Sequence, residues 1–142
     1  MQVQIKKLYE DSIIPTRGSK EAAGHDLYAH EGVIIEPHTT VKVGTGVAIK
    51  APEGTFGAIF ARSGLATKQG LRPANCVGVC DSDYTGEYIV PLHNDTNEIQ
   101  SITAGERIGQ VVFIPYVDVG FMEVKELEAT ERGDGGFGST GV

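Results

Sequence analysis

The residues best suited to chemistry lie in short segments that contain glycine, and one such segment is Arg62-Ser63-Gly64. It follows an apolar run and precedes a stretch that favours a helix. Backbone amides at the start of a helix can converge on an anion together with a hydroxyl and a guanidinium, and phosphate is the natural candidate. On these residues alone, a capping serine beside a solvated arginine is an equally good interpretation.

A second segment holds carboxylates and a tyrosine in a turn. Asp81, Asp83 and Tyr84 lie between the apolar runs 77–80 and 88–92, a pattern typical of a β-hairpin. An ionised aspartate can take a proton from a water molecule that lies within hydrogen-bond distance. Either aspartate is therefore a candidate general base, and an ordinary aspartate-stabilised turn is the alternative.

Asp26 and Gln110 mark two further segments. A single carboxylate is too little for a metal site built by the protein, but Mg²⁺ often keeps its waters and is carried by substrate phosphates with one or two carboxylates. Gln110 precedes the apolar run 111–114, so we expect it at a strand start, where its amide can donate to a phosphate. A satisfied polar residue at a sheet edge is the alternative. Cys76 and Cys80 have no further ligands at metal spacing, which predicts buried free thiols.

The last segment, residues 132–141, has too few apolar side chains to offset the entropy of ordering it, so we expect it to be mobile in an isolated chain. It holds one arginine, one phenylalanine and two hydroxyl residues among five glycines. Glycine lets a backbone approach a ligand closely, so this composition suits a lid. A frayed terminus is the alternative.

Length and charge limit the classes of function. A chain of 142 residues forms one domain of ordinary size. Its 19 acidic and 12 basic residues give a net charge of −7, which repels a polyanion, so we expect no direct binding to nucleic acid. No apolar stretch suits a signal peptide or a membrane span, and we expect a cytoplasmic or host-intracellular protein that does not contact a membrane.

The elements that position these residues are short. Apolar, β-branched runs between turn residues predict an all-β single domain, a β-sandwich or jelly-roll-like barrel with one short helix. The runs are 3–5, 33–35, 41–43, 47–49, 56–60, 77–80, 88–92, 108–114 and 122–127. We expect turns at 44–46, 52–54 and 95–97, and a helix capped by Ser63 and ended by Gly70. A β-rich core over 1–131 would then carry a flexible C-terminal lid over 132–142 of the same domain.

Taken together, the segments 23–29, 61–66, 75–86, 105–110 and 132–141 resemble the five motifs of the homotrimeric dUTPases in order, spacing and wording. The resemblance covers the chain from about residue 12 to its end. It implies hydrolysis of dUTP to dUMP and pyrophosphate with Mg²⁺, which limits uracil incorporation into DNA and supplies dUMP for dTMP synthesis. It also implies a homotrimer whose active sites are shared between subunits, with the tail of one subunit closing over a neighbour's site.

The resemblance assigns roles to individual residues. It makes Asp81 the base that deprotonates the attacking water, and it places Asp26 in the water shell of the metal. Tyr84 would exclude a ribose 2′-hydroxyl. The remaining substrate contacts are to uracil by Asn75 and the main chain of Val79, Cys80 and Ile89, to the phosphates by Arg62, Ser63, Gly64 and Gln110, and from the tail by Arg132, Phe137, Gly138, Ser139 and Thr140.

Two departures and two rival functions stand beside this hypothesis. Cys80 and Gly109 replace the family's more frequent Ile or Val and Ala, and we expect neither change to matter greatly. Arg107 looks structural.

A relative of the dCTP deaminases would share the fold, but those proteins are generally longer and lack a tail with Phe137. The other rival is a β-rich trimer that binds a nucleotide or a protein without turnover, against which the intact Asp81 argues.

Overall fold

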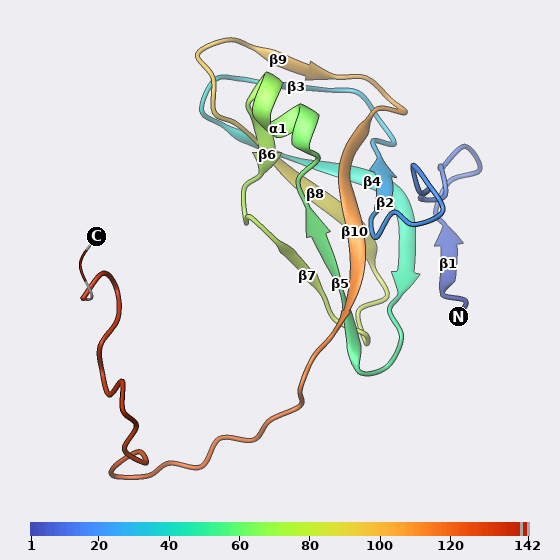
Figure 1. Cartoon of the computed structure of the whole chain (residues 1–142). Helices are drawn as coiled ribbons and strands as arrows, with labels where there is room; N and C mark the ends of the chain where they lie inside the picture. The colour runs from blue at the N-terminus through green and yellow to red at the C-terminus, as the bar shows by residue number, and fades with distance from the viewer. Residues whose placement is uncertain (140, 142) are drawn as a thin grey trace.

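A computed structural model describes residues 1–139 and 141 of the chain. In that part the chain forms ten strands and one helix (Figure 1). The elements in order are β1 (Gln4–Lys7), β2 (His25–Tyr28), β3 (Val33–Ile35), β4 (Thr40–Lys50), β5 (Thr55–Phe60), α1 (Ser63–Gln69), β6 (Leu71–Pro73), β7 (Gly78–Cys80), β8 (Glu87–Asn94), β9 (Gln100–Ile102) and β10 (Arg107–Pro115).

The strands form two antiparallel sheets with the core between them, and the predicted β-sandwich is confirmed. One sheet has the order β1-β4-β8-β6 and the other β2-β10-β5-β7, while β3 and β9 pair separately. The core combines inward side chains of both sheets, including the fully buried Leu27, Val43, Tyr88 and Ile108. In β8 the buried residues alternate with partly or largely exposed ones, as a strand with one face on a core requires.

The glycines at 44–46 do not form the predicted turn, because strand β4 continues through them without a break. Gly44 pairs with Ile89 and Ala48 with Glu87, so the register shifts between these two pairs and β4 carries a bulge. Gly46 has a φ of 69°, a conformation that glycine adopts without strain. The predicted runs 41–43 and 47–49 are therefore two parts of one bent strand.

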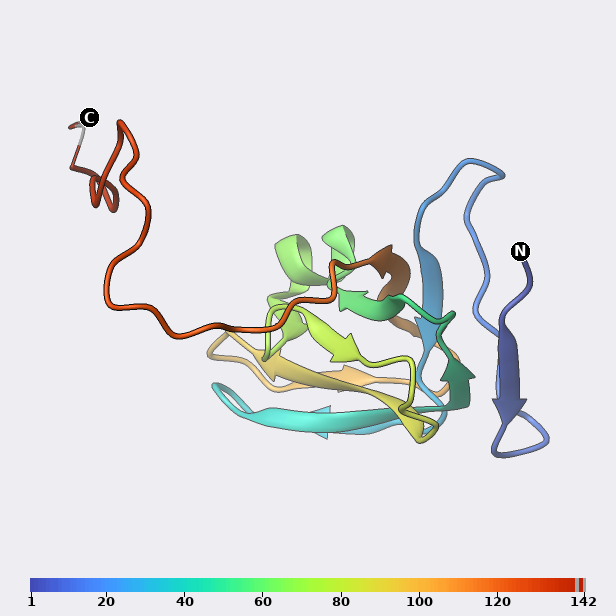
Figure 2. The same ribbon diagram turned by 90° about the horizontal axis from the view of Figure 1, so that it is seen from below.

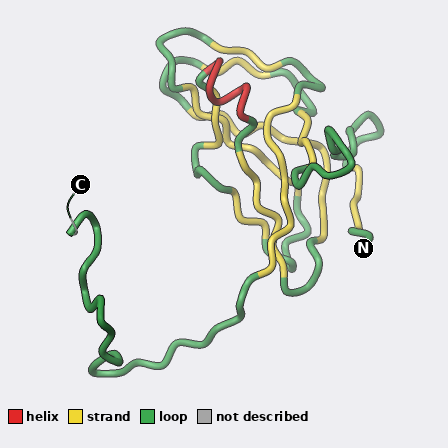
Figure 3. Tube along the Cα trace, viewed as in Figure 1, coloured by secondary structure: helices red, strands yellow, loops and turns green. Residues whose placement is uncertain are grey.

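The other predicted runs are mostly confirmed within one or two residues, with one exception. The run 122–127 is not a strand; Figure 3 shows loop throughout this part of the chain. A single strand needs a partner to satisfy its backbone groups, and this segment has none here. Strands β2, β6 and β9 were not predicted, because they are short and mix polar residues or proline with the apolar ones.

Helix α1 ends as predicted but begins differently. Gly70 takes the left-handed conformation, with a φ of 66°, and its N–H donates to the Leu65 carbonyl. Ser63 is the first helical residue rather than the cap, so that prediction is wrong. The cap position belongs to Arg62, whose backbone is still extended as the chain leaves β5 and whose side chain makes no capping hydrogen bond.

Beyond β10 the chain leaves the sandwich, and both views in Figures 1 and 2 show it running away from the two sheets. Large apolar side chains in this extension are exposed, among them Val117, Phe121 and Leu127 at 82%, 99% and 88%. The sandwich thus ends at Pro115, and the boundary of a lid at residue 132 stays a prediction.

Candidate functional site

A pocket of about 220 Å³ lies on the hairpin formed by β7, the following turn and β8. It brings together six of the predicted site residues. Its lining consists of Ile59, Asn75, Gly78, Val79, Cys80, Asp81, Tyr84, Glu87 and Ile89. Ile59, Gly78 and Glu87 were not predicted as site residues. The sequence carries no signal for Ile59 and Glu87, because Ile59 has the pattern of a core residue and Glu87 that of an ordinary strand residue.

Strand β7 can offer backbone groups to a ligand because it is an edge strand of its sheet in the described part of the chain. Its pairing with β5 joins Gly57 to Cys80 and Ile59 to Gly78, so only one side of its backbone is used. An edge strand leaves N–H and C=O groups of the other side without strand partners. Val79 points outward, with 62% of its surface exposed.

Tyr84 folds its ring back over the hairpin turn. Its hydroxyl donates to the Glu87 carbonyl at 2.8 Å, and its ring stacks on Tyr88 with centroids 6.4 Å apart. Gly86 permits this arrangement, because a Cβ there would lie 2.6 Å from the Tyr84 hydroxyl. Tyr84 is 42% exposed and lines the pocket, so part of its side chain is available to a ligand.

Cys80 forms an apolar wall of this pocket. Burial raises the pKa of its thiol to about 11, so the thiol stays protonated at neutral pH. The Tyr88 hydroxyl lies near it in the core, where burial also raises the pKa of the phenol. Both cysteines are free as predicted, but Cys76 is exposed rather than buried because it lies in the loop before β7.

A second cluster is centred on Asp26, in β2. Its Oδ1 accepts a hydrogen bond from Arg62 Nε at 2.9 Å, and its Oδ2 lies 3.6 Å from Arg107 Nη1. The side chain of Asp26 is 15% exposed and that of Arg62 is 29% exposed, so the Arg62 pair is partly shielded from solvent. The carboxylate therefore fixes one edge of the Arg62 guanidinium.

Gln110 belongs to the same cluster, but it does not lie at the start of its strand as predicted, nor on a sheet edge as the alternative required. It is the fourth residue of β10 and pairs with Asp26 of β2 on one side and Phe60 of β5 on the other. Its side-chain amide donates to the Ala61 carbonyl at 2.9 Å. Gly24 leaves room for it, because a Cβ at that glycine would lie 2.2 Å from Gln110 Oε1.

A pocket of about 460 Å³ opens beside this cluster and is lined by Arg62, Gly64, Leu65, Lys68, Gln69, Gly105, Glu106 and Arg107. Three of these side chains are cationic, and sequence reasoning did not select Lys68 or Arg107. Lys68 follows Gly64 by four residues on α1, a spacing that could have indicated a shared face. Arg107 meets Asp26 only through the pairing of β10 with β2, which the sequence does not reveal.

The two clusters are far apart within one chain. Cys80 lies opposite Gly57, so Asp81 continues toward Phe56, whereas Arg62 lies beyond the other end of β5. Six residues of extended chain from Phe56 to Arg62 span about 20 Å. The two pockets share no lining residue. A single chain does not bring the Asp81 carboxylate and the Arg62 guanidinium to the same atom.

The tail residues also stay away from both pockets. Arg132 Nε donates to the Gly135 carbonyl at 2.6 Å, which closes a local turn. Phe137 is fully exposed, and Gly138 and Ser139 follow it in the extension seen in Figure 1. Thr140 lies outside the described residues.

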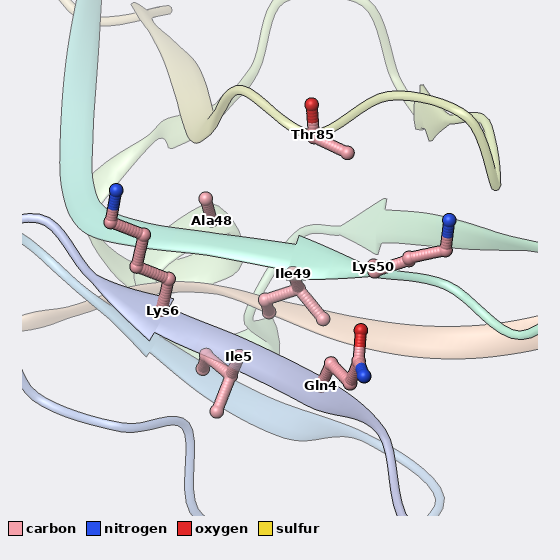
Figure 4. A pocket seen from close by; sticks show the side chains of 7 residues that line it. All are labelled: Gln4, Ile5, Lys6, Ala48, Ile49, Lys50 and Thr85. Atoms are coloured by element: carbon pink, nitrogen blue, oxygen red, sulfur yellow. The ribbon is translucent and has the colours of Figure 1, made fainter.

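A further groove lies elsewhere, beside β1, β4 and the loop that holds Thr85 (Figure 4). Its volume is about 490 Å³, and the other lining residues are Gln4, Ile5, Lys6, Ala48, Ile49 and Lys50. It contains no carboxylate and no predicted site residue.

Among the described residues, no three His, Cys, Asp or Glu side chains form a metal-binding group. No helix in the same range is long and apolar enough to cross a membrane.

Comparison with known proteins agrees with this geometry. The dUTPase family model matches residues 10–141. The deoxyuridine 5′-triphosphate nucleotidohydrolase of Nautilia profundicola is 48% identical over 99% of both chains. The dUTPase of Staphylococcus bacteriophage 80alpha, solved with dUpNHpp, has a TM-score of 0.91 and 31% identity over 99% of both chains. The dUTPase of phage phi11 of S. aureus, which coordinates a structural Mg(II) ion, has a TM-score of 0.82 and 26% identity over 91% of this chain and 100% of its own. These matches, which extend over the hairpin pocket and the Asp26 cluster alike, show that the chain belongs to the dUTPase family and is a dUTP diphosphatase.

Proposed function

We propose that the chain cleaves dUTP by in-line attack of water on the α-phosphorus, in a site assembled from more than one copy of the chain. The observation that carries this proposal is the hairpin pocket, in which the exposed carboxylate of Asp81 lies beside the edge backbone of β7 and the ring of Tyr84. These are the groups needed to hold a deoxynucleoside and to activate water at its phosphate.

The pocket would select the nucleoside by shape and by backbone contacts. The main chain of Val79, Cys80 and Ile89 and the amide of Asn75 would read the edge of uracil, and the closeness of the hairpin would reject the 5-methyl group of thymine by steric clash. The Tyr84 ring would lie against the deoxyribose and leave no space for a 2′-hydroxyl. Because Cys80 contributes backbone and an apolar wall, its thiol can stand in for a larger hydrophobic residue.

At the reacting end, Asp81 would accept a proton from the attacking water as its oxygen bonds to the α-phosphorus and the bond to pyrophosphate breaks. Phosphoryl transfer depends mainly on positioning and charge neutralisation. Arg62, Ser63, Gly64 and Gln110 would bind the phosphates. Arg62 suits this role because only its Nε bonds to Asp26, which leaves the terminal guanidinium nitrogens to donate.

The donor set suits a magnesium ion that is carried by the substrate. Asp26 is the carboxylate that was predicted to lie in the water shell of the metal, and its Oδ2 lies 3.6 Å from Arg107 Nη1. It can accept a hydrogen bond from a metal-bound water, whereas a protein-built site would need more carboxylates. Bound Mg²⁺ would neutralise charge on the phosphates, while Asp26 orients its water.

A homotrimer explains why the site residues are scattered in one chain. About 20 Å of extended chain separates Phe56, which lies opposite Asp81, from Arg62. In a trimer, copies of the chain would supply each other's missing parts, including the detached tail. The extension carries three exposed apolar side chains, Val117, Phe121 and Leu127. They could be buried in the apolar pocket of about 380 Å³ beside β1 of another copy. Burying these apolar surfaces together favours assembly.

We therefore expect the protein to sediment as three chains of 15.1 kDa each at assay concentration. Sedimentation equilibrium measures this mass without reference to shape. A monomeric mass under conditions of full activity would contradict the shared site, because one chain would then have to complete it alone.

The tail would close over a neighbour's site as a lid. Phe137 would stack on uracil, Arg132 would approach the terminal phosphate, and Gly138, Ser139 and Thr140 would donate further hydrogen bonds. Closure would exclude water and strengthen the charged contacts inside. The free thiols of Cys76 and Cys80 suit a reducing compartment, which places the protein in the cytoplasm in this proposal. There the reaction would keep uracil out of DNA and supply dUMP for dTMP synthesis.

The purified protein should release pyrophosphate from dUTP in the presence of magnesium, and should release it far more slowly from dCTP or UTP at comparable concentrations. Pyrophosphate and ammonia are measured separately with each nucleotide. Ammonia from dCTP would identify the deaminase chemistry of the rival hypothesis. Binding of dUTP without either product would identify a nucleotide-binding trimer without turnover.

A further inference from the structure

The bulge in β4 lies directly behind the hairpin pocket and is joined to the start of β8 by two side-chain contacts. Thr45 Oγ1, which is buried, donates to the Tyr88 carbonyl at 2.6 Å. The second contact also has its donor in β4, because Glu87 Oε1 accepts a hydrogen bond from the Gly46 N–H at 2.8 Å. The bulge therefore holds the two residues with which β8 begins.

Two glycines of the bulge receive the Glu87 carboxylate in different ways. Gly44 leaves room for it, because a Cβ there would lie 2.6 Å from Glu87 Oε1. Gly46 donates its N–H to the carboxylate and has the positive φ noted above, which glycine adopts without strain. A side chain at Gly44 would displace the carboxylate, so this part of the bulge accommodates Glu87.

Both residues held by the bulge also hold Tyr84. The Glu87 carbonyl accepts the Tyr84 hydroxyl, and the Tyr88 ring stacks on the Tyr84 ring. Tyr84 is 42% exposed, so part of its surface is not held by the fold. The position of the Tyr84 ring therefore depends on how firmly the backbone at Glu87 is fixed.

We propose that Glu87 is a positioning residue for sugar selectivity: its carboxylate, seated on the β4 bulge, fixes the backbone carbonyl that orients Tyr84. This inference rests on the proposed role of Tyr84 in excluding a 2′-hydroxyl. A hydrogen bond to an ionised acceptor is stronger than one between neutral groups, so the carboxylate suits the task. Glu87 acts through Tyr84 and touches no reacting atom in this scheme.

The test measures kcat/KM for dUTP divided by kcat/KM for UTP, which is called the dUTP-to-UTP ratio. Wild type is first compared with four single variants. Glu87→Ala removes the acceptor, and Glu87→Asp keeps the charge but is one methylene too short to reach the Gly46 N–H. In both, we expect the dUTP-to-UTP ratio to fall about tenfold, the effect of losing one hydrogen bond to a charged group. Glu87→Gln keeps an oxygen for the Gly46 N–H and should retain most of the ratio. Glu53→Ala, at the exposed turn after β4, is the matched control and should leave it unchanged.

Three outcomes decide the inference. An unchanged ratio in folded Glu87→Ala and Glu87→Asp would overturn it, and so would an equal loss in Glu87→Gln. The double variant Tyr84→Phe with Glu87→Ala should lose little more than either single variant, because both remove the same constraint; additive losses would also overturn it. A wild-type protein that does not distinguish dUTP from UTP would instead contradict the proposed function, before any variant is considered. Thermal melting shows which variants fold, and Glu87→Asp supplies the test if Glu87→Ala does not.

Discussion

Replacing Asp81 by asparagine should lower kcat for dUTP hydrolysis by roughly 10²-fold to 10⁴-fold, the usual contribution of a general base. The amide has nearly the shape of the carboxylate but cannot accept the proton of the attacking water. Asp81 lies at the mouth of the hairpin pocket and makes no contact on which the fold depends, so the variant should fold normally. Its Kd for dUpNHpp, which cannot complete the reaction, should stay within a few-fold of wild type.

Asp83→Asn is the matched control, because this carboxylate belongs to the same exposed turn but does not line the pocket. It should leave kcat nearly unchanged. Single-turnover kinetics with saturating enzyme separate the chemical step from product release. Normal kcat in Asp81→Asn, or an equal loss in both variants, would remove Asp81 from the role of base.

The hairpin pocket could be predicted almost completely because its parts are neighbours in the sequence. Asn75, Val79, Asp81 and Tyr84 lie within ten residues, and a hairpin brings such residues together whatever the rest of the chain does. Glu87 escaped prediction, since its role depends on a glycine bulge more than forty residues earlier. Sequence patterns therefore identify sites whose residues are neighbours in the chain, but not the contacts from distant strands that hold those residues in place.

The phosphate cluster shows the opposite case. Asp26, Arg62 and Gln110 were predicted one by one, but their mutual contacts and the part played by Arg107 were not, because strand register decides them. The pairing of β10 with β2 and β5 puts Gln110 between Asp26 and Phe60 and brings Arg107 to Asp26. A shift of one residue would turn these side chains to the other face of the sheet. Sequence spacing alone does not record such a register.

The bulge and the helix start reveal a third limit. Two glycines around Thr45 match a turn by composition, yet the contact of Thr45 with the Tyr88 carbonyl keeps them inside one strand. Ser63 matches a helix cap by type, yet the chain leaves β5 still extended and makes Arg62 the boundary residue. In both cases a tertiary contact outweighs a local preference. The run 122–127 fails for the same reason, since a strand pattern without a partner strand stays a loop.

Ending the chain at Glu131 should lower kcat for dUTP by roughly 10²-fold, since the closing lid both excludes water and positions the substrate. The tail contacts neither pocket of its own chain, and the sandwich ends at Pro115, so the shortened chain should keep its fold and its oligomeric mass. Circular dichroism and sedimentation check both. Undiminished turnover would show that residues 132–142 are only a frayed end.

A mixing experiment then tests whether the tail serves a neighbour. The shortened chain keeps Asp81 but lacks a lid, while the Asp81→Asn chain keeps the lid but lacks the base. The two chains are refolded together in equal amounts. If each lid closes over another subunit's Asp81, about a quarter of wild-type turnover should return. Random assembly gives each site an intact Asp81 in about half of cases and an intact neighbouring tail in about half. If each lid served its own chain, no site in the mixture would be complete. Mixing the two folded proteins without subunit exchange is the control and should give only the residual activity of each, so recovery after refolding would locate the tail on a neighbour.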